Sequence, residues 1–272
     1  MQSKLLLSCI FICFLQACAS GSLVDDLKSE GELFENAQSY LEQKNYPLAI
    51  SQLESLATRF PFGLYSNEVK LQLIYAHYQN NAFSIAALHA ERFIRFNLDH
   101  EQLDYAYFIK AMSYYSEYQS SASALLKRGP EGFDQSSGKE AFTSFQQLTT
   151  VFPSTQYRAQ SQAKMRILKE NFAAYENRIG LFYLNGQNYV AAINRANYVM
   201  GNFPETQQQG DALSILILAN NALGNQLQSD QALSLLTKYF PEHLALQSGS
   251  FKTPFIEEKR LWVRILTLGF FN

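Results

Sequence analysis

The chain has 272 residues, of which 47% are hydrophobic and 14% aromatic, so it can bury a sizeable core. That composition excludes a disordered chain and a miniprotein held together by disulfides. With only 13 Gly and 7 Pro there are few breakers, which favours long helices over a many-stranded barrel or sandwich. The net charge of −2 offers no basic surface for counterion release, so nucleic acid is excluded as the main partner.

The N-terminus has the pattern of an export signal. Lys4 is followed by an apolar run over residues 5–15 and by a small residue before a processing point. The run is too short for a transmembrane helix, which needs roughly 20 apolar residues. All three cysteines, Cys9, Cys13 and Cys18, lie in this region, so a mature domain has no thiol pair for a disulfide or a zinc site.

The end of this signal, Leu15-Gln16-Ala17-Cys18, resembles the lipobox of bacterial lipoproteins. The resemblance implies that residues 1–17 are removed and that Cys18 is lipidated, so that acyl chains hold the protein on a membrane without a spanning helix. Ala19 rather than Asp follows, which implies the outer membrane. The alternative is ordinary cleavage that leaves a free thiol. Residues 18–31 are expected to form the lipidated tether.

Four segments farther along the chain share one layout. In three of them an Asn precedes a proline by 16 residues, and all four have small or apolar residues 12 and 8 positions before that proline. Small residues permit close approach of two helices, an apolar residue fills the seam, and proline ends the second helix. The residues 12 positions before are Ala49, Ala141, Ala192 and Ser229, and those 8 positions before are Leu53, Phe145, Ala196 and Leu233.

This unit resembles the tetratricopeptide repeat of about 34 residues, whose signature is matched by Ala37-Tyr40-Ala49-Pro61 and by Gly180-Tyr183-Ala192-Pro204. A second repeat, over residues 67–100, has Leu98 where proline is expected. A third has a long first helix over 105–119 and an insertion over 120–138. The expected fold is therefore all-α, a right-handed superhelical solenoid of about five tetratricopeptide-type helical hairpins.

No catalytic motif is found. Gly132 and Gly138 are separated by five residues where a phosphate-binding loop requires four, and Glu140 stands where Ser or Thr should bind magnesium. The four histidines do not pair with other ligands at metal-binding spacing, and no serine lies in a nucleophile elbow. We expect no enzyme activity, no cofactor and no metal.

An ordered set of motifs resembles the BamD family, the tetratricopeptide-repeat lipoproteins of the outer-membrane β-barrel assembly machinery. The resemblance extends over about residues 32–240 and agrees with the lipobox. The motifs are Arg59-Phe-Pro-Phe-Gly63, Leu73-Ile-Tyr-Ala-His-Tyr78, Arg92-Phe-Ile-Arg95, Phe152-Pro-Ser-Thr-Gln-Tyr157 and Ile193-Asn-Arg195.

The resemblance implies a non-enzymatic scaffold on the periplasmic face of the outer membrane. Such a scaffold binds the periplasmic domains of the insertase BamA through repeats 3–5 (residues 101–243) and joins other Bam complex subunits. It receives unfolded β-barrel precursors in a groove of repeats 1–2 (residues 32–100). Two alternatives stay open: another helical-repeat lipoprotein, such as a secretin pilot or a peptidoglycan-associated scaffold, and a free periplasmic peptide-binding module.

Candidate precursor-binding residues follow from the way such solenoids bind peptides. The first helix of each repeat lines the concave face, so aromatic and apolar residues there are predicted to form the groove, and nearby arginines to meet a terminal carboxylate. The alternative is that these residues pack in the core or lie on a solvated face, which for Leu71 is as good an assignment. The predicted groove residues are Phe34, Leu41, Tyr65, Tyr75, Tyr78, Arg92 and Arg95.

Two further predictions concern the C-terminal half. Arg195 stands beside the seam position Ala196 and is predicted to bind the insertase, whereas the alternative is an intramolecular pair with Glu176. Residues 244–272 contain the only Trp and have an amphipathic pattern. This tail either caps the last repeat or docks on a membrane surface or a partner.

Overall fold

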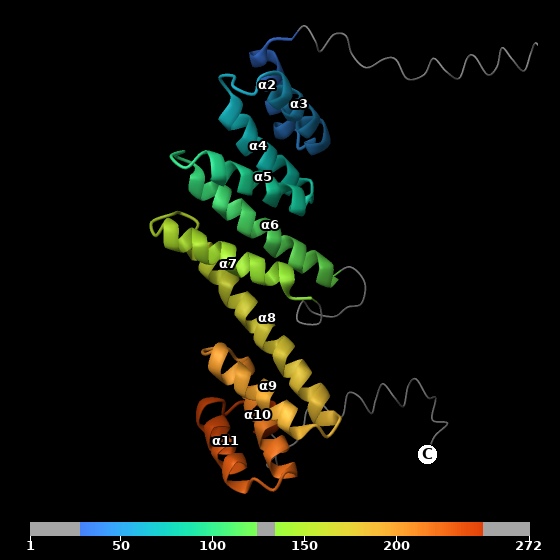
Figure 1. The fold of residues 1–272 in the computed structure, drawn as a ribbon, viewed down its shortest axis with the longest axis vertical. Helices are drawn as coiled ribbons and strands as arrows, with labels where there is room; N and C mark the ends of the chain where they lie inside the picture. The colour runs from blue at the N-terminus through green and yellow to red at the C-terminus, as the bar shows by residue number, and fades with distance from the viewer. Residues whose placement is uncertain (1–27, 124–133, 247–272) are drawn as a thin grey trace, which may run out of the picture. The chain divides into compact units, whose positions relative to one another are not determined.

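The computed structural model describes residues 28–123 and 134–246. The predicted signal peptide, Cys18, most of the tether and the tail from residue 247 onward lie outside the described residues. Within these two ranges the chain forms ten α-helices, one 3-10 helix and no strand (Figure 1). The elements are α2 (Glu30–Glu42), α3 (Tyr46–Arg59), α4 (Ser66–Gln79), α5 (Phe83–Phe96), α6 (Leu103–Ser123), α7 (Ser136–Val151), α8 (Arg158–Asn185), α9 (Tyr189–Asn202), α10 (Gln208–Ala222), α11 (Gln226–Tyr239) and η4 (Leu244–Leu246).

The helices pair in chain order into five hairpins. α2 packs on α3, and α4 on α5, in an N-terminal unit that ends at Asp99. α6 packs on α7, α8 on α9, and α10 on α11 in a C-terminal unit that begins at His100. Inside each unit a hairpin also contacts the next one, so apolar faces are buried between neighbours. The predicted all-α fold of five helical hairpins is confirmed.

One turn conformation joins the two helices in four of the five hairpins. In each, a residue with a left-handed backbone stands directly before the N-cap of the second helix, which reverses the chain in a few residues. Asn45 is such an N-cap, and its side-chain oxygen accepts a hydrogen bond from the Leu48 N–H at 3.4 Å. The recurring Asn of the sequence pattern therefore marks a helix start. The left-handed residues are Lys44 (φ 57°), Asn81 (59°), Gln187 (61°) and Gly224 (75°).

The second helices also end in one way. Phe60, the C-cap of α3, has φ −127° and ψ 60°, and a proline follows it. Asn97, the C-cap of α5, has nearly the same angles, −135° and 54°, although Leu98 follows. Its side-chain amide donates to the Phe93 carbonyl at 2.9 Å and so satisfies a carbonyl near the helix end. The helix thus stops at the expected place without the proline.

Three of the four predicted seam positions in the second helices are buried. Leu53, Phe145 and Ala196 are fully buried, and so are the small residues one turn before them. Leu233 was predicted as the equivalent residue of α11, but it is 36% exposed. The reason is that no further helix pair follows α11 within the described residues to cover this position.

The third hairpin differs from the prediction at its connection. α6 continues to Ser123 and α7 begins at Ser136, so the predicted insertion over 120–138 was too long at both ends. Gly138, assigned to the loop, is buried in the first turn of α7. A Cβ there would lie 3.1 Å from Phe172 and 3.2 Å from Tyr118, so Gly permits a close helix approach rather than a turn.

α8 has 28 residues, twice the length of α9, and contacts α7, α9 and α10. The repeat pattern did not predict a helix of this length, because it marked only the C-terminal half. There Gly180 lies against α9 as expected, with its position for a Cβ 3.5 Å from the Cβ of Arg195. Among residues 28–123 and 134–246, no helix combines the length and hydropathy needed to cross a bilayer.

Candidate binding sites in the two helical units

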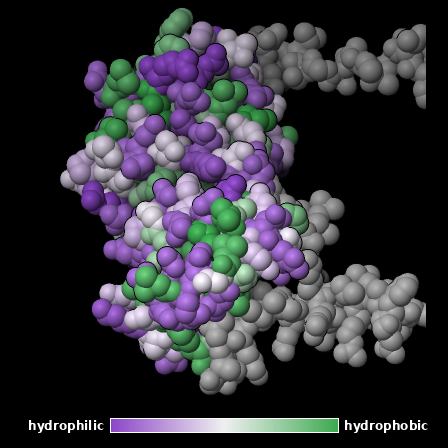
Figure 2. All heavy atoms as spheres, turned by 60° about the horizontal axis from the view of Figure 1, so that its bottom comes forward, coloured by the Kyte–Doolittle hydropathy of each residue, from purple (hydrophilic) through white to green (hydrophobic). Residues whose placement is uncertain are grey.

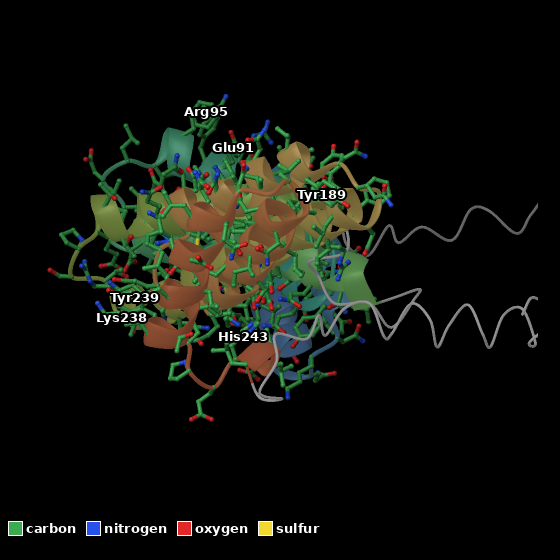
Figure 3. All side chains as sticks on the ribbon, turned by 90° about the horizontal axis from the view of Figure 1, so that it is seen from below. Glu91, Arg95, Tyr189, Lys238, Tyr239 and His243 are labelled. Carbon is green, nitrogen blue, oxygen red and sulfur yellow. The ribbon has the colours of Figure 1, made fainter. Side chains whose placement is uncertain are left out.

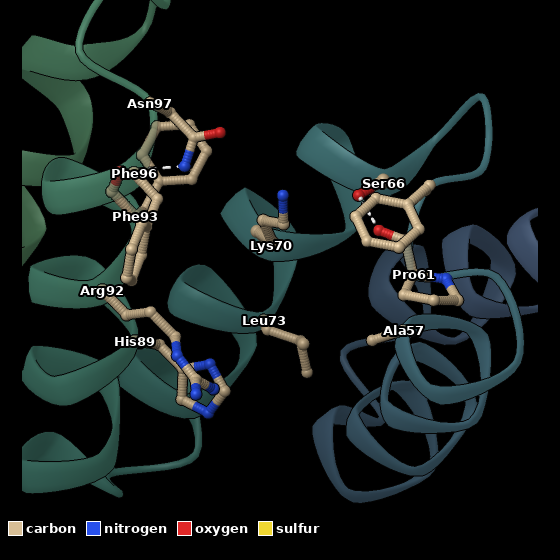
Figure 4. A pocket seen from close by; sticks show the side chains of 11 residues that line it. Ala57, Pro61, Ser66, Lys70, Leu73, His89, Arg92, Phe93, Phe96 and Asn97 are labelled. Atoms are coloured by element: carbon tan, nitrogen blue, oxygen red, sulfur yellow. Dashed lines mark hydrogen bonds between the residues drawn. The ribbon is translucent and has the colours of Figure 1, made fainter.

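The N-terminal unit has a pocket of about 340 Å3 bounded by α3, α4, α5 and the turn after α3. Apolar and aromatic side chains dominate its lining, with two cationic residues among them. Figure 4 shows Arg92 and His89 side by side on one wall and Pro61 and Ser66 on the other. The lining residues are Ala57, Pro61, Phe62, Ser66, Lys70, Leu73, His89, Arg92, Phe93, Phe96 and Asn97.

The pocket combines a rigid floor with open aromatic groups. Leu73 and Phe93 are 3% and 1% exposed, whereas Phe62 and Phe96 are 97% and 72% exposed. Exposed aromatic rings at a pocket mouth offer large contact area at small entropic cost. The arrangement suits an apolar or aromatic side chain of a peptide.

Two cations supply the polar part of the pocket. The Lys70 ammonium donates to the Asn67 side-chain oxygen at 3.0 Å, and neither Lys70 nor Arg92 has a carboxylate partner among the residues described. A carboxylate near the bound side chain would therefore meet an unneutralised guanidinium, which forms strong, often bidentate hydrogen bonds to carboxylates.

A histidine pair lies behind this wall. The rings of His77 and His89 stack with centroids 5.0 Å apart, and His77 is 6% exposed. Burial lowers the pKa of both side chains, and the neighbouring His77 and, to a smaller extent, Arg92 lower the pKa of His89 further. Glu54, 3.8 Å from the His77 ring nitrogen, opposes the shift but does not outweigh burial.

These pKa shifts predict acid sensitivity. Because the folded-state pKa values lie below the ordinary value of 6.5, the unfolded chain binds protons more readily as the pH falls through that value. Stability that is fully present above pH 6.5 should therefore decline below it. Melting temperatures from pH 8 to pH 5 measure this decline, and His77→Leu should make it shallower than in the parent chain. An identical profile for this variant would contradict the assignment to His77.

Most of the predicted groove residues lie elsewhere than the pocket. Phe34 and Tyr65 stack with centroids 4.2 Å apart, and both pack with Leu41 against the N-terminal core. Leu71 is 3% exposed, as its packing alternative requires. These contacts correspond to the alternative assignment, in which these residues pack in the core instead of lining a groove.

The remaining predicted groove residues, two tyrosines and two arginines, lie in different surroundings. Tyr75 meets the edge of Tyr46, and Tyr78 lies against Phe83. Burial and a hydrogen bond with Tyr46 raise the pKa of Tyr75. Arg95 pairs with Glu91 at 3.3 Å, and Figure 3 shows the two next to each other on the outside of α5. Of the predicted groove residues, the pocket includes Arg92.

Of the eleven pocket residues, sequence reasoning predicted only Arg92 as a groove residue, and three of the missed ones are informative. Phe62 and Phe96 lie outside the first helix of a repeat, where the groove was predicted, and Lys70, although on α4, is neither aromatic nor an arginine. A usable signal was present, since Phe62 directly follows the Phe60-Pro61 helix stop, where no seam requires a large apolar residue.

Figure 2 shows that apolar residues form separate patches among hydrophilic ones on the face that it presents.

In the C-terminal unit, the structure contains the intramolecular pair that was the alternative for Arg195. Its guanidinium donates to the Glu176 carboxylate at 2.9 Å. The Arg195 side chain is 41% exposed and that of Glu176 is 16% exposed. Hydrogen bonding to Glu176 raises the pKa of Arg195, with a smaller contribution from Tyr183. The guanidinium thus keeps an open side toward solvent while Glu176 holds its orientation.

The part of the chain that the structure describes contains no cluster of three or more His, Cys, Asp or Glu side chains suited to a metal ion. Its candidate binding features are a pocket of about 340 Å3 and a half-exposed arginine held by an ion pair. The fold and these sites define a helical-repeat binding scaffold.

The chain belongs to the YfiO family, described as outer membrane lipoprotein, whose model matches residues 26–235. Its relatives include proteins named outer membrane protein assembly factor BamD. That of Vibrio cholerae is 30% identical over 82% of this chain and 93% of its own length. The protein of Neisseria meningitidis serogroup A is 30% identical over 88% and 92%, and that of Pasteurella multocida is 30% identical over 74% and 77%. The family confirms the predicted resemblance and the non-enzymatic class.

Proposed function

We propose that this chain is a scaffold lipoprotein of outer-membrane β-barrel assembly. Its N-terminal unit binds unfolded β-barrel precursors, and its C-terminal unit binds the periplasmic domains of the insertase BamA and so joins the Bam complex. The observation that carries the first part is the N-terminal pocket, where exposed Phe62 and Phe96 stand beside Arg92. Membership of an outer membrane lipoprotein family and relatives named as assembly factors support the setting.

The pocket fits a precursor better than a folded protein. Its volume of about 340 Å3 holds one or two side chains rather than a domain surface. An unfolded chain can present an aromatic side chain and a nearby carboxylate in many registers, which suits open aromatic groups and a single uncompensated arginine.

Purification from detergent-solubilised outer membrane tests the proposed function as a whole. The full lipidated chain should retain BamA through washing, and a mock purification without the chain should not. Recovery of the chain without BamA would contradict the insertase part of the proposal. Precursor binding is tested separately, with variants of the pocket residues.

Attachment through Cys18 is a further part of the proposal, supported by the lipobox and by the family description. The Cys18→Ala variant should leave the outer-membrane fraction as a soluble or uncleaved species, because it lacks the acyl chains that hold the protein there. Helical content should be unchanged, since α2 begins at Glu30. Membrane fractionation and metabolic acyl labelling check the two expectations. Label that persists on the variant would refute the assignment.

The start of the C-terminal tail packs on the last hairpin, where Ala245 is fully buried against α10 and α11, and for residues 247–272 we propose docking. α11 has Asp230 and Thr237 exposed at the positions where α9 has Ile193 and Met200, which pack against the neighbouring core. Two positions of α11 where a following helix would pack are therefore polar, as in terminal repeats, although Leu233 between them is an exposed apolar residue. At the end of α11, Lys238 lies over the Tyr239 ring at 4.9 Å (Figure 3). These polar positions support docking of the tail's apolar residues on a membrane or a partner.

A further inference from the structure

A second groove lies inside the C-terminal unit, between α7 and the first half of α8. Its volume is about 600 Å3, and its lining includes Phe142 and Gln146 from α7 and Gln162, Met165, Arg166 and Lys169 from α8. The spacing of these residues, about one turn apart on each helix, places them along one face of each helix. The groove therefore runs along the two helices rather than into the core.

The groove is positively charged without compensation. Arg166 is exposed and Lys169 half-buried, and neither has a carboxylate partner among the described residues. The nearest acidic residue in sequence, Glu170, is engaged elsewhere, because it accepts a hydrogen bond from the Gln207 N–H at 3.0 Å. Lys164 lies over the Tyr115 ring at 4.4 Å. In a chain of net charge −2, two cations without a carboxylate partner therefore give this groove a local positive charge.

The rest of the lining suits a peptide backbone and an apolar side chain. Phe142 is half-buried and meets the edge of Phe172 with centroids 6.4 Å apart, so its ring is held in place. Met165 is half-buried and can adapt to the shape of a bound group. Gln146 and Gln162 each carry both donors and acceptors, which an extended backbone can use.

We propose that this groove binds an acidic, extended segment of a partner protein. Two carboxylates of the segment pair with Arg166 and Lys169, and an apolar side chain packs on Phe142 and Met165. Residues three apart on a helix lie roughly 5–6 Å apart, close to the spacing of alternate side chains on a strand, so acidic residues at alternate positions fit. An anionic membrane fits less well, because a flat headgroup layer would not reach an aromatic floor between two helices.

A direct binding measurement tests the groove. The probe is a short fluorescent peptide in which Glu alternates with Leu, titrated with the purified full chain in detergent. The parent should bind it with a strong salt dependence, and Arg166→Glu with Lys169→Glu should weaken binding at least about tenfold. The matched control, Lys44→Glu with Lys238→Glu, changes the net charge equally at sites outside the groove and should bind like the parent. Melting curves must show that both double variants are folded.

Three outcomes would overturn the proposal: no binding by the parent, equal weakening by both double variants, or equal binding of the same peptide with Lys in place of Glu. A second experiment identifies the bound partner. A photo-cross-linking residue is placed at Gln162 of the lipidated chain, and the cross-link is formed in cells. The cross-linked segment should be acidic and should be lost in the groove variant, and a cross-link to lipid or to a basic segment would also overturn it. Because Arg166 and Lys169 lie in the C-terminal unit, outside the N-terminal pocket, their double variant reports on this groove, and failure here is distinct from failure of that pocket.

Discussion

Replacing Phe62 and Phe96 together by Ala should weaken binding of an unfolded β-barrel-precursor peptide by about thirtyfold, the effect of losing about 2 kcal/mol from an aromatic contact site. The melting temperature should change little, because the two rings are 97% and 72% exposed and support no core. Fluorescence anisotropy of a labelled peptide measures the affinity. A loss of binding that only follows a loss of stability would count against the pocket.

Matched variants separate the pocket from general surface effects. Phe182→Ala removes a ring that is 71% exposed in the C-terminal unit and should leave peptide binding unchanged. Tyr75→Ala with Tyr78→Ala tests the earlier groove assignment. Because these rings contact Tyr46 and Phe83, this variant should lower the melting temperature clearly. Its affinity for the peptide should change little as long as the chain is folded.

The carboxylate part of the site has its own readout. Arg92→Ala should weaken binding of a peptide with a free C-terminal carboxylate by about tenfold or more, since a hydrogen bond to a charged group is worth about 1.5–3 kcal/mol. The same peptide with a C-terminal amide should bind the parent and the variant equally. Arg95→Ala is the matched control, because Arg95 already pairs with Glu91 outside the pocket. Equal losses for the acid and the amide would show that Arg92 only packs.

Much of the fold was predictable because the repeat imposes local rules. Asn45 predicts the start of α3, and the burial of Ala49 and Leu53 follows from their fixed distance to Pro61. α5 shows that these rules are redundant, because it ends at Phe96 with Leu98 in place of proline. Leu233 shows their limit, since a seam residue is buried only when a neighbouring helix is present.

The sites were less predictable, because they depend on which side of a helix faces a gap. Arg92 was correctly predicted to lie at a binding surface. Phe34 and Tyr65 were predicted there too, but their rings stack on each other, a contact that sequence spacing does not show. The pocket forms where the turn after α3 faces α5, and the repeat signature does not predict that these two segments lie opposite each other. Likewise, the sequence does not show that Glu170, four residues after Arg166, accepts a hydrogen bond from the Gln207 N–H.

Exchanging the charges of one ion pair should abolish insertase binding while preserving the fold of the C-terminal unit. Arg195 holds Glu176 at 2.9 Å, and Glu176 is only 16% exposed, so Arg195→Glu alone would bring two carboxylates together. That single variant should lose both stability and BamA, and it cannot separate the two roles. The double variant Arg195→Glu with Glu176→Arg restores an ion pair but presents the opposite charge to a partner.

Three results define the role of Arg195. The exchanged double variant should melt within a few degrees of the parent, since a pair of this exposure contributes about 1 kcal/mol. It should nevertheless lose BamA from the detergent-solubilised complex, because truncating or reversing one partner of a desolvated interface pair costs about 2–5 kcal/mol, more than tenfold in affinity. A matching acidic-to-basic change on BamA should restore co-purification with the exchanged variant. If the exchanged variant retains BamA as well as the parent does, Arg195 serves only to hold Glu176, and the insertase contact lies elsewhere on the C-terminal unit.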